Sequence, residues 1–88
     1  MEASSIRMLR LREVMLITGL ARSTVWLCVK RGTLPTPVKI GIKSVAWSSL
    51  EIDQVVKARL AGFSEEAIKH LVKRLEGERG EFLQMAFA

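Results

Sequence analysis

The sequence predicts a mainly α-helical domain with one small β-hairpin. Apolar residues recur at three- and four-residue steps in four segments, which is the period of amphipathic helices. Glycines follow the first two of these segments, and a stretch of alternating apolar and polar residues separates the second from the third. The length of 88 residues, 49% of them hydrophobic, suits one domain with a modest core.

The chain divides into four parts along its length. Residues 1–8 are expected to form a flexible leader, and residues 9–61 the main domain. Residues 62–77 are expected to form an additional helix, and residues 78–88 an apolar tail that begins with helix breakers. The chain has no apolar run long enough to span a membrane, and its first residues lack the order of parts of a signal peptide.

The first two helices are predicted to be short and to be joined by a turn. The apolar stripe of the first consists of Leu9, Leu11, Val14 and Met15. The second helix is expected to run from about residue 22 to residue 30 or 31, and its stripe consists of Val25, Cys28 and Val29. Gly19 and Gly32 follow the two stripes, and glycine ends helices because it adopts the left-handed conformation without steric cost. Two such helices predict a helix-turn-helix.

A hairpin is predicted after residues 33–37 (TLPTP), whose prolines stop the second helix. The apolar residues that alternate with polar or small ones on both sides of residues 41–44 (GIKS) are Val38, Ile40, Ile42, Val45 and Trp47. Basic residues lie at the tip of this hairpin, which is therefore a candidate wing beside the helix-turn-helix.

Two further helices are predicted from their caps. Ser48 caps the third, Glu51 completes a capping box, and Trp47 and Ile52 form a hydrophobic staple. The third helix ends at residues 61–62, and Ser64 begins the fourth. The stripe of the fourth consists of Ile68, Leu71, Val72 and Leu75. The apolar tail residues, which can dock on the domain, join a partner or hang free, are Phe82, Leu83, Met85 and Phe87.

The excess positive charge lies in the first half of the chain. Residues 1–47 hold eight basic and two acidic side chains, a balance of +6, whereas residues 48–88 hold six basic and seven acidic ones, a balance of −1. This asymmetry favours a first half that faces a polyanion and a second half with a structural role.

Enzyme chemistry is not expected, because the chain offers no set of residues for a catalytic site. Cys28 and His70 are the sole residues of their types. We interpret Cys28 as a small buried hydrophobe and His70 as a surface residue, so neither a catalytic pair nor a metal site is expected. No phosphate-binding or dinucleotide-binding motif is present, so no cofactor or small-molecule substrate is predicted. A single cysteine also suits a reducing cytoplasm.

The polar start of the second helix is the candidate DNA-reading segment. In a helix-turn-helix the second helix lies in the major groove with its N-terminal residues nearest the base edges. Arg22, Ser23 and Thr24 occupy this turn, where arginine can donate two hydrogen bonds to guanine and the hydroxyls can bond bases or phosphates. Lys30 and Arg31 lie farther along the helix and are expected to contact phosphates.

The candidate wing adds Lys39, Lys43 and Ser44, which we expect to contact the adjacent backbone or the minor groove. Trp26 has two interpretations, because it can stack on a sugar or thymine methyl group, or cover the core between the helix and the wing. Leu27 can likewise touch a thymine methyl group or pack on the hairpin.

The run from residue 10 to residue 59 resembles the AlpA-type regulators of prophages and genomic islands. The pieces that carry this resemblance, in order and without gaps, are EVMLITGLARSTVW, KRGTLPTPVKIG and SVAWSSLEIDQ. These regulators are relatives of phage excisionases and have a MerR-like winged helix-turn-helix. Ala21, Leu27 and Ile42 depart from the serine, arginine and glycine common there, and Ala21 is expected to weaken the helix start by about 1 kcal/mol.

The resemblance implies a cytoplasmic, nucleoid-associated protein that binds double-stranded DNA through the helix from Arg22 and the wing at residues 39–44. It implies control of integrase or excision genes, direct service as an excisionase, or both, with an integrase or a second copy of the chain as a possible partner. The alternative from another class is a protein–protein interaction module, with Trp26, Leu27 and the C-terminal tail as its apolar surface.

Overall fold

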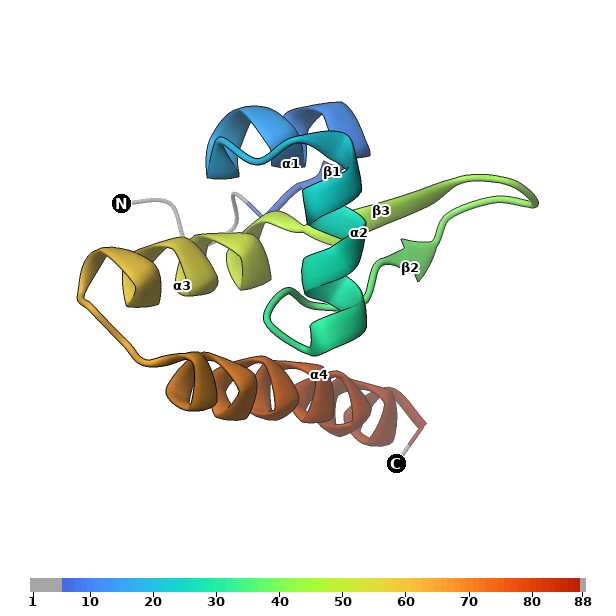
Figure 1. Cartoon of the computed structure of the whole chain (residues 1–88). Coiled ribbons are helices and arrows are strands. Elements are labelled where there is room, and N and C mark those ends of the chain that lie inside the picture. Colours follow the sequence, from blue (N-terminus) through green and yellow to red (C-terminus); the bar gives the residue numbers. More distant parts are fainter. Residues whose placement is uncertain (1–5, 88) are drawn as a thin grey trace.

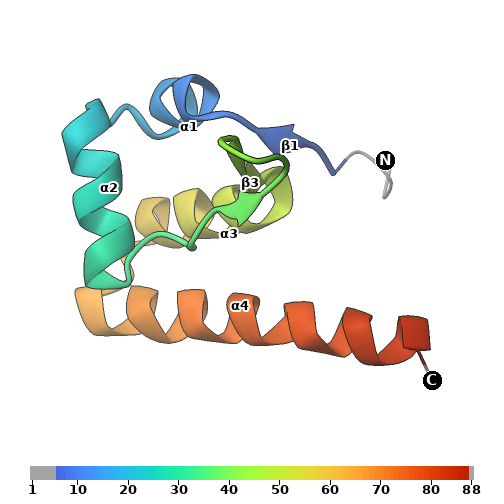
Figure 2. The same ribbon diagram turned by 90° about the vertical axis from the view of Figure 1, so that its right-hand side faces the viewer.

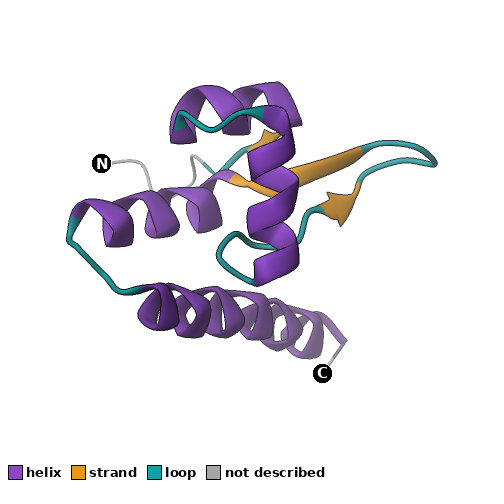
Figure 3. Cartoon of the chain, in the orientation of Figure 1, coloured by secondary structure: helices purple, strands orange, loops and turns teal. Residues whose placement is uncertain are grey.

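The structure is a computed structural model that describes residues 6–87, with side chains described as far as residue 81. Its elements are β1 (Met8–Leu9), α1 (Leu11–Thr18), α2 (Arg22–Arg31), β2 (Val38–Lys39), β3 (Val45–Ser48), α3 (Ser49–Leu60) and α4 (Glu65–Phe87). The helices surround a small antiparallel sheet, as Figures 1 and 3 show. The predicted class, mainly α-helical with a β-hairpin arranged as a winged helix-turn-helix, is confirmed.

Glycine turns shape the helix-turn-helix as predicted. Gly19 (φ 75°) ends α1 and donates its N–H to the carbonyl of Met15 at 2.8 Å. Gly32 (φ 84°) ends α2 in the same left-handed conformation. Both backbone angles lie in a region that residues with a Cβ atom adopt only under strain. α2 begins at Arg22 as predicted and ends at Arg31, the later of its two predicted ends, where Gly32 provides the local stop signal.

The predicted flexible leader is wrong for the last residues of its range. Met8 pairs with Ser48 and Leu9 with Trp47 in an antiparallel register. The N–H of Ser49 also donates to the carbonyl of Arg7 at 2.8 Å. Arg7 and Met8 are therefore joined to the sheet region, and α1 begins two residues later than predicted because Leu9 belongs to a strand. The first five residues of the predicted leader lie outside the described part of the chain.

The predicted hairpin is confirmed, and β3 lies between β1 and β2 in the sheet. Val38 pairs with Ala46 and Lys39 with Val45, and the N–H of Ile40 donates to the carbonyl of Ser44 at 2.9 Å to close the tip. In Figure 1 this hairpin extends past α2 and away from α3. It therefore has the position of a wing.

The core lies where the sheet and all four helices meet. Its fully buried members include Leu9, Val14, Val25, Trp47, Ile52 and Ile68. Ser48 caps α3 as predicted, since its Oγ accepts a hydrogen bond from the N–H of Glu51 at 3.3 Å. The second half of the predicted capping box is wrong, because the Glu51 carboxylate binds the guanidinium of Arg79 instead.

The fourth helix is longer than predicted. α4 continues through Gly77 and Gly80 to Phe87, so the backbone at residues 78–87 is helical and not a separate tail. Its stripe packs as predicted, with Ile68, Val72 and Leu75 buried. Figure 2 shows α4 running beneath the rest of the domain. The predicted tail residues Phe82, Leu83, Met85 and Phe87 have side chains outside the described part of the chain.

None of the helices within residues 6–87 combines the length and the hydrophobicity that a membrane-spanning segment requires.

Candidate nucleic-acid interface

The start of α2 leaves backbone amides open to a ligand. Ala21 is the residue before the helix, and it makes no side-chain cap hydrogen bond. The first helical hydrogen bond runs from the N–H of Val25 to the carbonyl of Ala21 at 2.9 Å. The amides of residues 22–24 precede this bond and have no carbonyl partner within the helix. These amides lie at the N-terminal end of α2, where the helix dipole is positive. This end of the helix therefore favours the binding of an anion such as a phosphate.

The outer face of α2 is polar at its start and basic at its end. Arg22 and Ser23 are exposed and Thr24 is half-buried. Ser23, Leu27 and Lys30 follow one another at steps of four and three residues, so they form one row on the helix surface. Arg31 is also exposed, whereas Val25 is fully buried on the opposite side. The amphipathic pattern read from the sequence therefore places the candidate DNA-reading residues outward.

Trp26 connects the core to this outer face. Its ring centroid lies 5.3 Å from that of Trp47, and the two ring planes are tilted by 49°. Trp47 is fully buried, whereas Trp26 keeps 41% of its surface exposed. Trp26 therefore covers the core, which was one of its two interpretations, and still presents apolar surface to a partner. Leu27 is exposed to a similar extent.

The wing presents two exposed lysines. Lys39 and Lys43 are exposed, and Ser44 is half-buried while its carbonyl closes the hairpin tip. Ile42 is 96% exposed beside Lys43, so the alternating pattern of the hairpin does not bury a side chain at its tip. The wing is thus a projecting, positively charged element next to α2.

The basic residues of α2 and the wing form no ion pair with another residue in the part of the chain whose side chains are described. The ion pairs among residues 6–81 are Arg7–Glu13, Lys57–Asp53, Arg59–Glu65, Lys69–Glu66, Arg74–Glu78 and Arg79–Glu51. Within residues 6–81, the cations of α2 and the wing take part in none of them. The physical reason lies in the sequence, because no Asp or Glu occurs between Glu13 and Glu51. The charge asymmetry of the two halves thus becomes an uncompensated positive surface.

Two further candidates were missed from the sequence. Arg10 and Arg12 are exposed at the start of α1, and neither forms an ion pair with another described residue. The first helix of a helix-turn-helix crosses the DNA backbone, so its early cations can contact phosphates. The same rule that selected Arg22 could have selected them.

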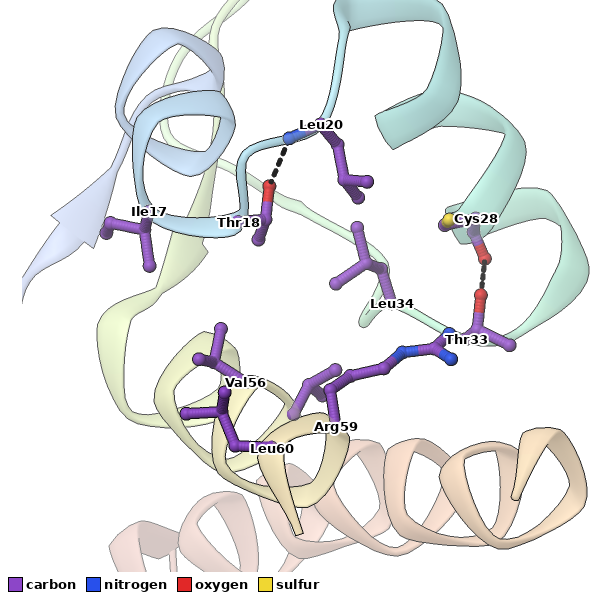
Figure 4. Close-up of a pocket in the computed structure, with 10 residues that line it drawn as sticks. Ile17, Thr18, Leu20, Cys28, Thr33, Leu34, Val56, Arg59 and Leu60 are labelled. Atoms are coloured by element: carbon purple, nitrogen blue, oxygen red, sulfur yellow. Dashed lines mark hydrogen bonds between the residues drawn. The ribbon is translucent and has the colours of Figure 1, made fainter. Parts of the chain in front are cut away.

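An apolar hollow of about 320 Å³ lies between the helix-turn-helix and α3 (Figure 4). Its lining consists of Ile17, Thr18, Leu20, Cys28, Thr33, Leu34, Val55, Val56, Arg59 and Leu60. Cys28 packs against the core as predicted, but it is half-buried and not fully buried, and it lines this hollow. No group of His, Cys, Asp and Glu that could hold a metal occurs among the described residues.

The sequence of this chain is similar to those of known proteins. Residues 7–60 match the family described as prophage CP4-57 regulatory protein (AlpA). The DNA-binding transcriptional activator AlpA of Escherichia coli K12 is 40% identical over 62 residues, which cover 64% of this chain and 89% of that protein. An uncharacterised protein of Enterobacteria phage P4 is 41% identical over 56 residues, and the match spans 64% of each chain.

No solved structure shows a significant match. The family match covers more than half of the chain, and it includes both helices of the helix-turn-helix and the wing. A family of regulatory proteins identifies the chain as a regulator and not as an enzyme. The resemblance seen in the sequence is confirmed, and the chain belongs to the AlpA family of prophage regulatory proteins.

Proposed function

We propose that this chain binds double-stranded DNA with sequence preference, using α2 and the wing. The observation that carries the proposal is the set of outward basic side chains on these two elements, which have no acidic partner among the described residues. Such cations favour binding to DNA phosphates, because the contacts of Lys and Arg with the phosphates release the counterions of the duplex. The Escherichia coli relative is a DNA-binding transcriptional activator, which supports the same function.

Each element has its own role in this proposal. Arg22, Ser23 and Thr24 read base edges in the major groove, while the open amides beside them bind a phosphate. Lys30 and Arg31 position α2 on the backbone. The wing residues Lys39, Lys43 and Ser44 contact the adjacent backbone or the minor groove. Trp26 and Leu27 supply apolar contact to sugars or thymine methyl groups.

The biological role that we propose is control of integrase or excision genes of a mobile element, direct service as an excisionase, or both. A regulator would bind a promoter, whereas an excisionase would bind adjacent sites at the element's attachment site and act together with an integrase or further copies of itself. Gel-shift titrations on the integrase promoter and on the attachment site, combined with an excision assay, separate these roles. Such a protein works in the cytoplasm, where the element's DNA lies.

The salt dependence of binding tests the proposal directly. Lys43→Ala should weaken binding to all duplexes and reduce the slope of log affinity against log salt by about one phosphate contact. Lys57→Ala is the matched control, because Lys57 pairs with Asp53 at 3.1 Å on α3, away from the proposed interface. Equal slopes for wild type and Lys43→Ala would exclude the wing contact.

The exposed surfaces of Trp26 and Leu27 also suit a second candidate, a protein-binding module. This candidate predicts complexes whose stability does not change with salt and no retardation of duplex DNA at low salt. The basic residues on the same helix favour DNA.

A further inference from the structure

The segment that joins α2 to the wing is held by side chains of α4. Pro35 and Pro37 of this segment lack an N–H, so Thr36 carries the one amide N–H within residues 35–37. That amide donates to Oε2 of Glu76 at 2.7 Å, and the Thr36 carbonyl accepts from Nη2 of Arg79 at 2.9 Å. Both backbone groups of Thr36 are therefore bound by residues one helical turn apart on α4.

Arg79 also ties this segment to α3. Its Nε donates to Oε2 of Glu51 at 2.9 Å and its Nη2 to Oε1 of the same carboxylate, which makes a bidentate ion pair. Glu51 is only 7% exposed and lies in the first turn of α3. The carboxylates of Glu51 and Glu76 raise the pKa of Arg79, so its positive charge is secure at any physiological pH. One guanidinium thus connects α3, α4 and the segment before the wing.

The segment that precedes Val38 determines where the wing can lie. The prolines restrict φ on both sides of Thr36, and Trp47 donates its Nε1–H to the Pro35 carbonyl at 2.8 Å. With Pro35 held by β3 and Thr36 by α4, the chain enters β2 at a defined place beside α2. The hairpin itself has only two residue pairs, so it offers little rigidity of its own.

We propose that Glu76 and Arg79 are positioning residues for the wing, which set its place relative to α2 and so the DNA contacts that it can make. The DNA part of this inference rests on the proposed function, whereas the positioning itself does not. Both residues lie beyond residues 7–60, the span matched by the family. α4 is therefore an added support for the wing and not only a cover for the core.

The positioning is tested first without DNA, by amide hydrogen exchange of the wing in the full chain. Glu76→Ala should raise the exchange rate of the Ile40 N–H, which closes the hairpin tip, several-fold. The melting temperature should change little, because the effect is local to the wing. Glu76→Gln provides a second variant that keeps the side-chain shape. The matched control is Glu78→Ala, which removes an exposed pair with Arg74 on the same helix. Because a glutamine oxygen can still accept the Thr36 N–H, Glu76→Gln should raise wing exchange less than Glu76→Ala does. Unchanged wing exchange in Glu76→Ala would overturn the inference.

Arg79 needs a paired substitution, because removing it alone would leave the buried Glu51 carboxylate without its partner. The double variant Glu51→Gln/Arg79→Met replaces the ion pair with neutral groups and should also raise wing exchange. Protection equal to that of wild type in this folded variant would remove Arg79 from the positioning role.

A double-mutant cycle then connects position to DNA binding. Lys43→Ala should weaken DNA binding in the wild-type background and have a smaller effect in the Glu76→Ala background, because a loosened wing has already lost its contact. Additive effects in a variant with raised wing exchange would overturn the link between position and contact. If Lys43→Ala has no effect in either background, the proposed wing contact fails, and the exchange data alone decide the positioning role.

Discussion

Trp26 on α2 packs against Trp47 on β3 at a centroid separation of 5.3 Å, so one pair of indoles joins the proposed recognition helix to the sheet from which the wing extends. The inner ring is fully buried and donates its N–H to the Pro35 carbonyl at 2.8 Å, while the outer ring stays partly exposed. This tilted geometry is favourable for aromatic pairs, which contribute beyond the area that they bury. The contact makes the relative position of α2 and the wing a property of the core.

Removing the outer ring tests this contact. Trp26→Ala should lower the free energy of unfolding by about 1–3 kcal/mol, less than for a fully buried tryptophan because part of the ring already faces solvent. Urea unfolding followed by circular dichroism measures the change. Leu27→Ala is the control, since Leu27 is equally exposed but lies on the outer row of the helix. Equal losses of unfolding free energy in the two variants would show that the indole pair contributes no more stability than an outer-row side chain of equal exposure.

Base reading by Arg22 predicts a loss confined to the specific site. Arg22→Ala should lower the affinity for the native operator by about 1–3 kcal/mol and change the affinity for unrelated duplexes much less. Competition gel shifts with specific and random DNA measure both quantities. Arg31→Ala is the comparison, because a phosphate contact should weaken both classes of duplex alike. Operator affinity equal to that of wild type would exclude Arg22 from base reading.

The uncapped start of α2 predicts a stabilising substitution. Ala21→Ser should raise the free energy of unfolding by about 1 kcal/mol, because the serine hydroxyl can accept a hydrogen bond from one of the free backbone amides at the start of α2. Ser48→Ala should cost a similar amount, since Ser48 caps α3 with the hydrogen bond that Ala21 cannot make. Thermal and urea unfolding of the two variants provide the measurement. A destabilising Ala21→Ser would show that the native backbone at residue 21 does not allow a cap.

Acid should weaken the start of α1 through Glu13. The backbone N–H of Arg10 donates to this carboxylate at 2.9 Å, and this bond, helped by the guanidinium of Arg7, holds the pKa of Glu13 below its ordinary value. The Glu13 carboxylate therefore binds a proton less tightly in the folded protein than in the unfolded chain. The resulting stability is fully present above the ordinary pKa of 4.5 and is lost as the pH falls through the lowered pKa.

Glu13→Gln should accordingly destabilise the protein at neutral pH and lose its difference from wild type in acid. Urea unfolding at a series of pH values measures this convergence. Glu81→Gln is the control, because Glu81 is exposed and forms no ion pair within the described part of the chain. A difference between Glu13→Gln and wild type that stays constant with pH would contradict the assigned hydrogen bonds.

Local signals were sufficient where neighbours in the chain decide the conformation. Gly19 and Gly32 mark the ends of the first two helices, and Ser48 marks the start of α3, because caps and left-handed turns depend on residues within one helical turn. The alternation around residues 41–44 identified the wing for the same reason. The outward placement of Arg22 and Ser23 followed from the helical period.

The errors arose where a distant partner decides. A strand of two residues, β1, has no periodic pattern of its own and exists because β3 offers it backbone partners. Glu51 has the spacing of a capping box, yet Arg79, which is 28 residues away, competes successfully for its carboxylate. Gly77 and Gly80 weaken a helix by about 1 kcal/mol each. α4 nevertheless continues through them, and Glu76 and Arg79 are held within it by tertiary contacts.

The sequence by itself determined the helix-turn-helix, the wing and the family, because these follow from short-range backbone preferences, apolar periodicity and matching motifs. It also contained the basic surface, since no acidic residue lies between Glu13 and Glu51. Only the tertiary structure decided how the wing is held, because that depends on side chains of α4 that reach a carbonyl and an amide some forty residues earlier. Such pairings are chosen by packing in three dimensions, where the free energy of a contact does not depend on the separation of its partners along the chain.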